Sequence, residues 1–351
     1  MKKLISIAVV LVVITSSIFV ISFIVKPKEV IAPGTLVLSD GDTVIVSVAV
    51  TNDPQPGDGL ISYRTDSEEN VYGPADFCID GADAYILNST NNTVLKFTDG
   101  SLTDTIDLDG FVGVRIAAYN GDLYILDNND VIRKHSAAGE TRFIGESRIV
   151  IGFDAVLSFD IFDGVIYLTT NGGDSGKIYK IPTEQSAASQ TGVEIVNGKT
   201  FDFKHIYTAE FLPEEGHSIG HGIKMDIISA PVEGKNDSVT FYSDFWLIGV
   251  RLFGVDYERN IFIVKLYEMA DKPDFTSANE ETLRVYDFQG NLKGVRSLGE
   301  KVKSITGQTK VFESGIYELN SLNDKVEIIR LALPDESSVS KYVSPLAYLI
   351  D

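Results

Sequence analysis

The chain of 351 residues is poor in cysteine, tryptophan and basic side chains. Its single cysteine, Cys78, excludes an intrachain disulfide, so the fold must be held together by its apolar core. Only 30 Lys and Arg stand against 50 Asp and Glu, which gives a formal net charge of −20. Because so acidic a surface repels phosphate backbones, nucleic acid is excluded as an expected partner.

Motifs for zinc proteolysis and nucleotide binding are also missing, since H-E-x-x-H, a P-loop and G-x-G-x-x-G do not occur. His217 and His221 are four residues apart, but the surrounding glycines indicate a loop and no third zinc ligand is identifiable. We therefore predict no catalytic residue, no metal ligand and no cofactor. Ca²⁺ or another divalent ion is the alternative, because oxygen ligands are abundant.

The longest apolar run covers residues 4–25. As a helix it would measure about 33 Å, which is enough to cross the hydrocarbon core of a bilayer. A secretory signal usually has a shorter apolar region followed by a small-x-small cleavage site. We predict an uncleaved membrane anchor over 1–26, a linker over 27–34, and a domain over 35–351 outside the cytoplasm of a single-pass membrane protein. The alternative is a cleaved signal peptide and a secreted protein.

A short phrase with a central aromatic residue recurs along the chain. Its copies read AYIL, LYIL, IYLT, IFIV and IYEL, centred on Tyr85, Tyr124, Tyr167, Phe262 and Tyr317. Each copy follows an Asp, Asn or Gly and is followed by a second strand-like run. Copies are about 40–55 residues apart, which is the range of propeller repeats, but the third interval is about twice as long. That interval predicts a degenerate unit over roughly 200–246.

Repeats of this length, each with three or four short strands, are typical of a β-propeller. The central runs are apolar on both faces, as expected of strands packed between neighbouring blades. Five copies and the degenerate unit predict six blades, with seven as the alternative count. The strand-like segment 35–51 could close the ring by pairing with 341–350, which would leave no exposed edge. The runner-up fold is a β-sandwich over about 30–70 followed by a smaller propeller.

The segment 73–97, GPADFCIDGADAYILNSTNNTVLKF, and the later LYILDNNDVIRK resemble repeats of bacterial extracellular six-bladed propellers of the NHL, YWTD and SMP-30 (gluconolactonase-like) kind. The resemblance covers about 73–330 and is strongest in the first two units. For the SMP-30 kind it implies a divalent ion in the central channel, but no residue of this chain matches those ligands individually. Fold alone assigns no activity.

Polar residues end several of the repeated strands and mark a candidate ligand face. Three residues beyond the aromatic stand Asn88, Asp127, Thr170 and Asn320, and Asn129 follows in the second of these loops. Because the positions are equivalent, they should share one face of the ring, where loops on a rigid scaffold carry function. The competing interpretation is that these residues only form hairpin turns.

The sequence thus favours a membrane-tethered extracellular binding module for a protein, peptide or glycan. The alternative is a metal-dependent hydrolase or lyase of the gluconolactonase-like type, with the ion in the channel. A structural spacer or sensor ectodomain is a third hypothesis for the function.

Overall fold

The chain divides into two units, residues 1–35 and 36–351. The structure is a computed structural model, and only the second unit contains residues that it describes. These residues are 41–51, 61–65, 71–108, 110–136, 141–143, 156–171, 176–183, 193–214, 220–229, 238–271, 277–298, 309–322, 324–342, 344 and 346. The predicted anchor and linker lie outside them. In the described part no helix is both long and apolar enough to cross a membrane.

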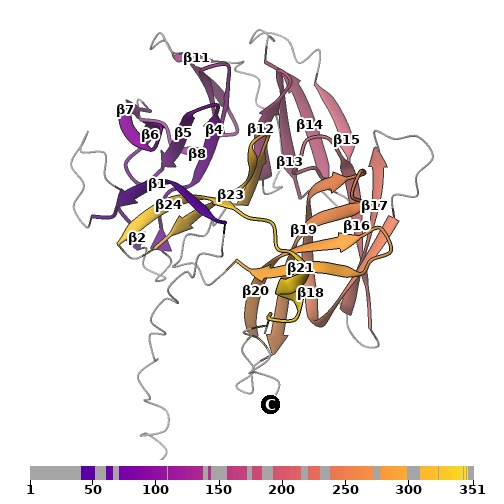
Figure 1. The fold of residues 1–351 in the computed structure, drawn as a ribbon. Coiled ribbons are helices and arrows are strands. Elements are labelled where there is room, and N and C mark those ends of the chain that lie inside the picture. Colours follow the sequence, from indigo (N-terminus) through magenta and orange to yellow (C-terminus); the bar gives the residue numbers. More distant parts are fainter. Residues whose placement is uncertain are drawn as a thin grey trace, which may run out of the picture. The chain divides into compact units, whose positions relative to one another are not determined.

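The first three sheets each have four antiparallel strands in chain order (Figure 1). Blade 1 contains β4 (Asp76–Asp80), β5 (Asp83–Asn88), β6 (Thr93–Thr98) and β7 (Ser101–Asp107). Blade 2 contains β8 (Gly113–Tyr119), β9 (Asp122–Asp127), β10 (Ile132–His135) and β11 (Thr141–Phe143). Blade 3 contains β12 (Val156–Phe162), β13 (Val165–Thr170), β14 (Lys177–Pro182) and β15 (Glu194–Asn197).

The remaining sheets differ from this simple order. Blade 4 has six strands, β16 (Ile206–Leu212), β17 (Gly220–Ser229), β18 (Ser238–Asp256), β19 (Ile261–Asp271), β20 (Ser277–Asp287) and β21 (Leu292–Ser297). Blade 5 combines β22 (Thr309–Phe312), β23 (Gly315–Ser321) and β24 (Lys325–Leu331) with β1 (Thr43–Ala49). A two-stranded ribbon, β2 (Arg64–Thr65) and β3 (Val71–Tyr72), and the short helix α2 (Glu336–Val339) complete the described elements.

The predicted β-propeller is confirmed, but the predicted count of six blades is wrong, because the described residues form five. The segment 200–246 forms no blade of its own, and its strands join those of the following repeat in blade 4. The two groups of strands form one sheet because strand β18 runs for 19 residues without a chain-reversing turn. It contains bulges at Leu247/Gly249 and Leu252/Gly254. Its first half pairs with β17 and its second half with β19.

β19 and β20 form a long hairpin and pair continuously from Ile261↔Asp287 to Asp271↔Ser277.

Ring closure occurs through the N-terminal strand, as expected, but with a different partner. β1 pairs antiparallel with β24, from Thr43↔Arg330 to Ala49↔Lys325, rather than with residues 341–350. Asp42, just before β1, accepts two hydrogen bonds from the Arg296 guanidinium, at 2.6 and 2.9 Å, and one from the Ala332 amide. The first described strand thus completes the last blade.

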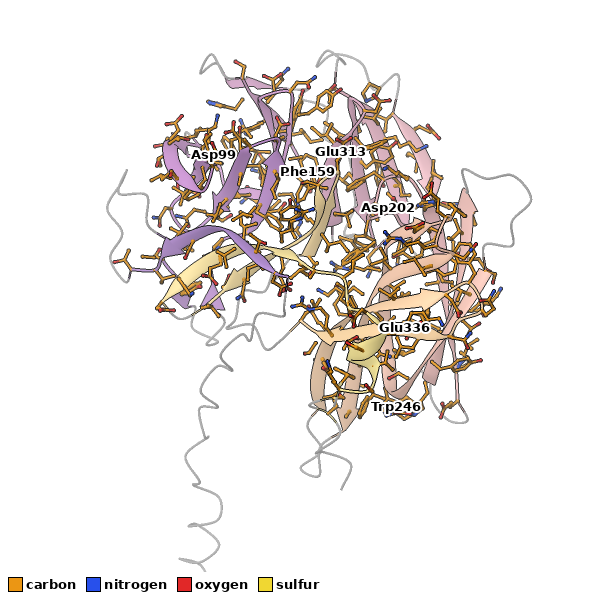
Figure 2. The ribbon with its side chains drawn as sticks, in the orientation of Figure 1. Asp99, Phe159, Asp202, Trp246, Glu313 and Glu336 are labelled. Atoms are coloured by element: carbon orange, nitrogen blue, oxygen red, sulfur yellow. The ribbon has the colours of Figure 1, made fainter. Side chains whose placement is uncertain are left out.

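The core lies between blades, which explains strands that are apolar on both faces. Tyr85, Ile86 and Leu87 follow one another in β5, and all three are buried. Alternate side chains of the strand therefore serve different interfaces, with Ile86 packed toward blade 5 and Tyr85 toward blade 2. Each fully buried large apolar side chain contributes about 1.5–3 kcal/mol. Phe159 lies in the interior between blades, far from Trp246 at the distant end of blade 4 (Figure 2).

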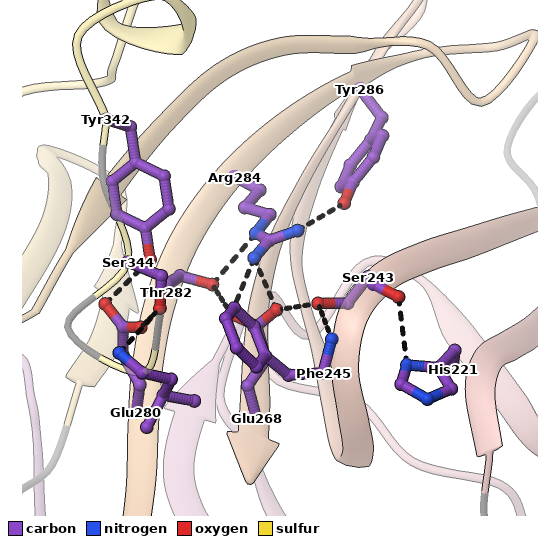
Figure 3. A network of polar contacts seen from close by, with 11 residues as sticks. His221, Ser243, Phe245, Glu268, Glu280, Thr282, Arg284, Tyr286, Tyr342 and Ser344 are labelled. Atoms are coloured by element: carbon purple, nitrogen blue, oxygen red, sulfur yellow. Dashed lines mark hydrogen bonds and ion pairs between the residues drawn. The ribbon is translucent and has the colours of Figure 1, made fainter. Parts of the chain in front are cut away.

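A buried polar network ties the C-terminal segment to blade 4 (Figure 3). Glu268 is fully buried and accepts hydrogen bonds from Arg284, at 2.5 and 2.6 Å, as well as from Ser243 and Thr282. On the neighbouring strand Glu280 accepts hydrogen bonds from the Tyr342 and Ser344 hydroxyls, at 2.7 and 2.5 Å. Leu346 then packs on Phe245 and Ala270. The described residues Tyr342, Ser344 and Leu346 of the segment 341–350, predicted to close the ring, thus contact blade 4 instead.

Candidate functional site

The residues of the predicted ligand face lie at equivalent strand ends, but most of their side chains are buried. Asn88, Asp127, Thr170 and Asn320 end or nearly end β5, β9, β13 and β23, and each is at most 1% exposed. Asn129 is exposed in the turn after β9 and donates to Asn128.

Asp127 shows what these buried polar groups do. Its Oδ1 accepts the amides of Asn129 and Val131, at 2.8 and 3.0 Å, and its Oδ2 pairs with Arg133 at 2.9 Å. Asn88 similarly accepts the Thr90 hydroxyl. Asp127 thus binds the turn after β9 and Arg133 of β10, Asn88 contacts the turn after β5, and ligand binding at the five positions stays a prediction.

A lysine ammonium occupies the interior of the channel, where the resemblance implied a divalent ion. Lys310, on β22, donates to Asp76 Oδ2 at 2.9 Å and to the carbonyls of Ile116 and Phe159 at 3.1 and 3.4 Å. One side chain thereby links the inner strands of blades 5, 1, 2 and 3. Within the described ranges, no three His, Cys, Asp or Glu side chains form a group that could hold a metal ion.

Asp160 lies beside this ammonium on β12 and is buried. Its Oδ1 accepts the Ile161 amide at 2.9 Å, and its Oδ2 has no partner in the described part of the chain. Burial raises the pKa of Asp160 to about 6, although the Lys310 charge opposes this shift. The ionised carboxylate of Asp160 therefore destabilises the folded protein relative to the protonated form.

Replacing Asp160 with asparagine is expected to stabilise the fold at pH 8 by about 2–3 kcal/mol. This free energy corresponds to the rise in the pKa of Asp160 from 3.8 to about 6. Since the folded pKa exceeds the unfolded one, wild-type stability should fall as pH rises from about 4 to about 6 and then level off. The Asn variant should lack this slope. Urea unfolding at several pH values measures both. An identical slope in the two proteins would contradict the assignment.

One end of the channel opens into a cavity of about 490 Å³ at the hairpins that follow the inner strands. Asp80, Asn120, Asp163 and Glu313 come from the turns of four blades. His205 also lines this cavity, and its Nδ1 lies 2.6 Å from Asp202 Oδ2. The lining is mainly turn residues and their acids, and it also includes Lys204, whose ammonium lies over the Phe162 ring.

A larger cavity, of about 940 Å³, lies between blades 3 and 4 toward the other ends of the inner strands. We call it the interblade cavity. Asn171, one residue beyond Thr170, lines it, so it belongs to the predicted ligand face. Its walls combine apolar and aromatic side chains with two cations, and include Leu157, Lys199, Phe201, Phe211, Ile248, Arg251 and Tyr267.

Arg251 and Lys199 are the functional candidates that the sequence did not reveal. The Arg251 guanidinium lies 4.9 Å from the centre of the Phe201 ring and 5.1 Å from that of Tyr267. Burial and the nearby charge of Arg251 lower the pKa of Lys199. A charged residue within the apolar run RLFGV was the available signal, but its surroundings depend on residues from blade 3.

Arg115 adds a third cation close to this end of the channel. It donates to the carbonyls of Val114 and Val156 at 2.8 and 2.9 Å, and its Nε has no partner among the described residues. Burial lowers its pKa, opposed by Asp76 and assisted by Arg251. Positive charge thus accumulates here in a protein of net charge −20.

Residues 216–220 read GHSIG and match the G-x-S-x-G pattern of the α/β-hydrolase nucleophile elbow. That elbow connects a strand to a following helix, whereas Gly220 begins strand β17. Ser218 and His217 lie outside the described residues, and His221 stacks on Trp246 at 4.9 Å. The pattern lacks its structural context here and supports no hydrolase assignment.

No family model matches the chain, and no curated protein matches it. Solved structures resemble it at low identity. Regucalcin, a calcium-binding protein of Agrobacterium tumefaciens, is 12% identical over 75% of this chain and 92% of its own, with a TM-score of 0.41. BamB of Moraxella catarrhalis is 11% identical over 83% and 98%, with a TM-score of 0.35. The WD40 domain of Doa1 is 14% identical over 83% and 97%, with a TM-score of 0.38.

Scores this low carry no argument about function. The fold class follows from the strand order of the sheets, which shows that the described residues form a five-bladed β-propeller.

Proposed function

We propose that this propeller is a binding module whose interblade cavity receives a segment of a protein or peptide. The supporting observation is the lining of that cavity, where apolar and aromatic side chains lie beside Arg251 and Lys199, two cations that form no ion pair in the described ranges. Its volume of about 940 Å³ falls within the range of ligand pockets. Phe211 and Ile248, at its rim, are 36% and 37% exposed and extend the apolar surface outward.

The predicted localisation is part of this proposal. An N-terminal segment that anchors the propeller outside the cytoplasm would present the cavity to extracellular partners. A glycan is the alternative ligand, since Asn171, Thr208 and Glu210 also line the cavity and can form hydrogen bonds. The gluconolactonase-like alternative has no supporting observation, since Lys310 lies among the channel oxygens where an ion would be needed.

Filling the cavity is expected to abolish binding. Ala209 lines it from β16, so Ala209→Trp should occupy the ligand's space, while Ala82→Trp places the same side chain on an exposed turn of blade 1. Peptides selected by phage display on the full-length protein in mild detergent should lose at least about tenfold in affinity for the first variant only. Equal affinity for A209W and wild type, or no selected peptide, would refute the proposed site.

A further inference from the structure

Arg251 and Lys199 are half-buried, and their surroundings differ from those of the fully buried cations in the described ranges. The fully buried cations are paired with acids, as in Lys310 with Asp76, Arg296 with Asp42 and Arg284 with Glu268. The side chains of Arg251 and Lys199 form no ion pair within the described ranges, although Glu210 and Asp226 also line the cavity and Asp226 pairs with Lys224. Two neighbouring cations that are not ion-paired are a place where a negative charge supplied by a ligand would be favourable.

The Arg251 side chain is fixed in position without using its hydrogen-bond donors. In β18 it pairs with Lys265 of β19, and Gly249 pairs with Tyr267, which brings the tyrosine ring against the guanidinium. Phe201, from the segment after β15, provides a second ring. Contact with two rings is favourable for a guanidinium without using its N–H donors, which remain available for a bidentate acceptor.

The charged form of Lys199 is disfavoured in the structure. Burial, and then the charge of Arg251, lower the pKa of Lys199. Burial also lowers the pKa of Arg115, which Asp76 opposes and the charge of Arg251 assists. A bound anion would favour the charged forms of Lys199 and Arg115.

We infer that the ligand is anchored by a carboxylate, which Arg251 binds bidentately and Lys199 neutralises, with an apolar or aromatic body on the remaining walls. This inference rests on the proposed function of the interblade cavity. A monoanion suits the site better than a phosphate of charge near −2, because Glu210 and Asp226 also line the cavity. Leu157, Ile223 and Val250 supply the apolar surface for the body.

The test compares acids with their neutral counterparts. N-acetylphenylalanine presents a chain-terminal carboxylate, and acetyl-Phe-Glu-amide presents a side-chain carboxylate. Their counterparts are N-acetylphenylalaninamide and acetyl-Phe-Gln-amide. Binding to the full-length protein in mild detergent is measured by ligand-observed NMR and calorimetry. Each acid that fits should bind at least about tenfold more tightly than its amide, and the better acid identifies the source of the carboxylate.

Two matched variants locate the effect. Arg251→Gln removes the guanidinium group and its charge. Arg259→Gln makes the same charge change at a side chain that is 73% exposed and lies 3.6 Å from Asp256. The first should remove the preference for acid over amide, and the second should retain it. Thermal unfolding of both variants confirms that they are folded.

Each outcome separates this inference from the proposed function. If the amides bind as tightly as the acids and A209W still blocks them, the cavity binds ligands but the carboxylate inference is wrong. Tighter binding of phenyl phosphate than of both acids would also overturn it. If no probe binds, the phage-selected peptides are titrated against R251Q, and undiminished affinity overturns the inference. Failure of the phage selection itself rejects the proposed function.

Discussion

Lys310→Met is expected to lower the free energy of unfolding by about 3–5 kcal/mol, because it leaves Asp76 buried without its counter-charge. Asp76 is 0% exposed, and Lys310 is its only ion-pair partner in the described ranges. Methionine keeps most of the side-chain length but removes the three donors that reach Asp76, Ile116 and Phe159. The loss should therefore reflect the charge and its hydrogen bonds rather than a cavity.

Urea unfolding followed by far-UV circular dichroism measures this loss. Lys177→Met is the matched control, since Lys177 is exposed on β14, and its effect should stay within about 0.5 kcal/mol. In an Asp76→Asn, Asp160→Asn background the Lys310→Met change should cost much less, because no buried carboxylate remains unpaired. A loss below about 1 kcal/mol in the wild-type background would show that water replaces the ammonium.

Arg284→Met is the second change with a large expected effect, again about 3–5 kcal/mol. Glu268 is fully buried, and its two carboxylate oxygens accept hydrogen bonds from one guanidinium nitrogen at 2.5 and 2.6 Å (Figure 3). Without Arg284 only the hydroxyls of Ser243 and Thr282 remain to stabilise that charge. The extended half of blade 4 should therefore loosen first.

Trp246 is the single tryptophan and pairs with Met269 beside this network, so its fluorescence reports on blade 4. Arg259→Met is the control, because Arg259 is largely exposed, and should leave the unfolding midpoint unchanged. Glu268→Leu combined with Arg284→Met should recover part of the loss, since an apolar pair replaces a broken ion pair. A double variant as unstable as Arg284→Met alone would contradict this account.

The fold was predictable where local sequence and local structure coincide. Tyr85 and Tyr124 lie at the centres of blades 1 and 2 because each hairpin is formed by residues that are close in sequence. Blade 4 was not predictable in this way. Nothing local distinguishes two strands separated by a turn from the single bulged strand β18, which is selected by its pairing with both β17 and β19.

The site was harder to predict because its features are relations between distant residues. Lys310 meets Asp76 across 234 positions, and Arg251 stacks on Phe201 from another blade. That the side chains of Arg251 and Lys199 form no ion pair in the described ranges is a property of the packed structure and cannot be read from the composition. The polar strand ends, by contrast, were visible in the sequence, and the structure shows Asp127 and Asn88 bound within turns.

The pairing of β1 with β24 has a consequence for biosynthesis. Ala49 pairs with Lys325, so β1 emerges from the ribosome long before its partner exists. At about 5–20 residues per second the delay is roughly 15–55 s. Throughout that time the edges of β1 are unpaired, and such an edge can join another chain. Synthesis of this protein therefore includes a period in which a holdase chaperone bound to β1 would raise the yield, and release has to wait for β24.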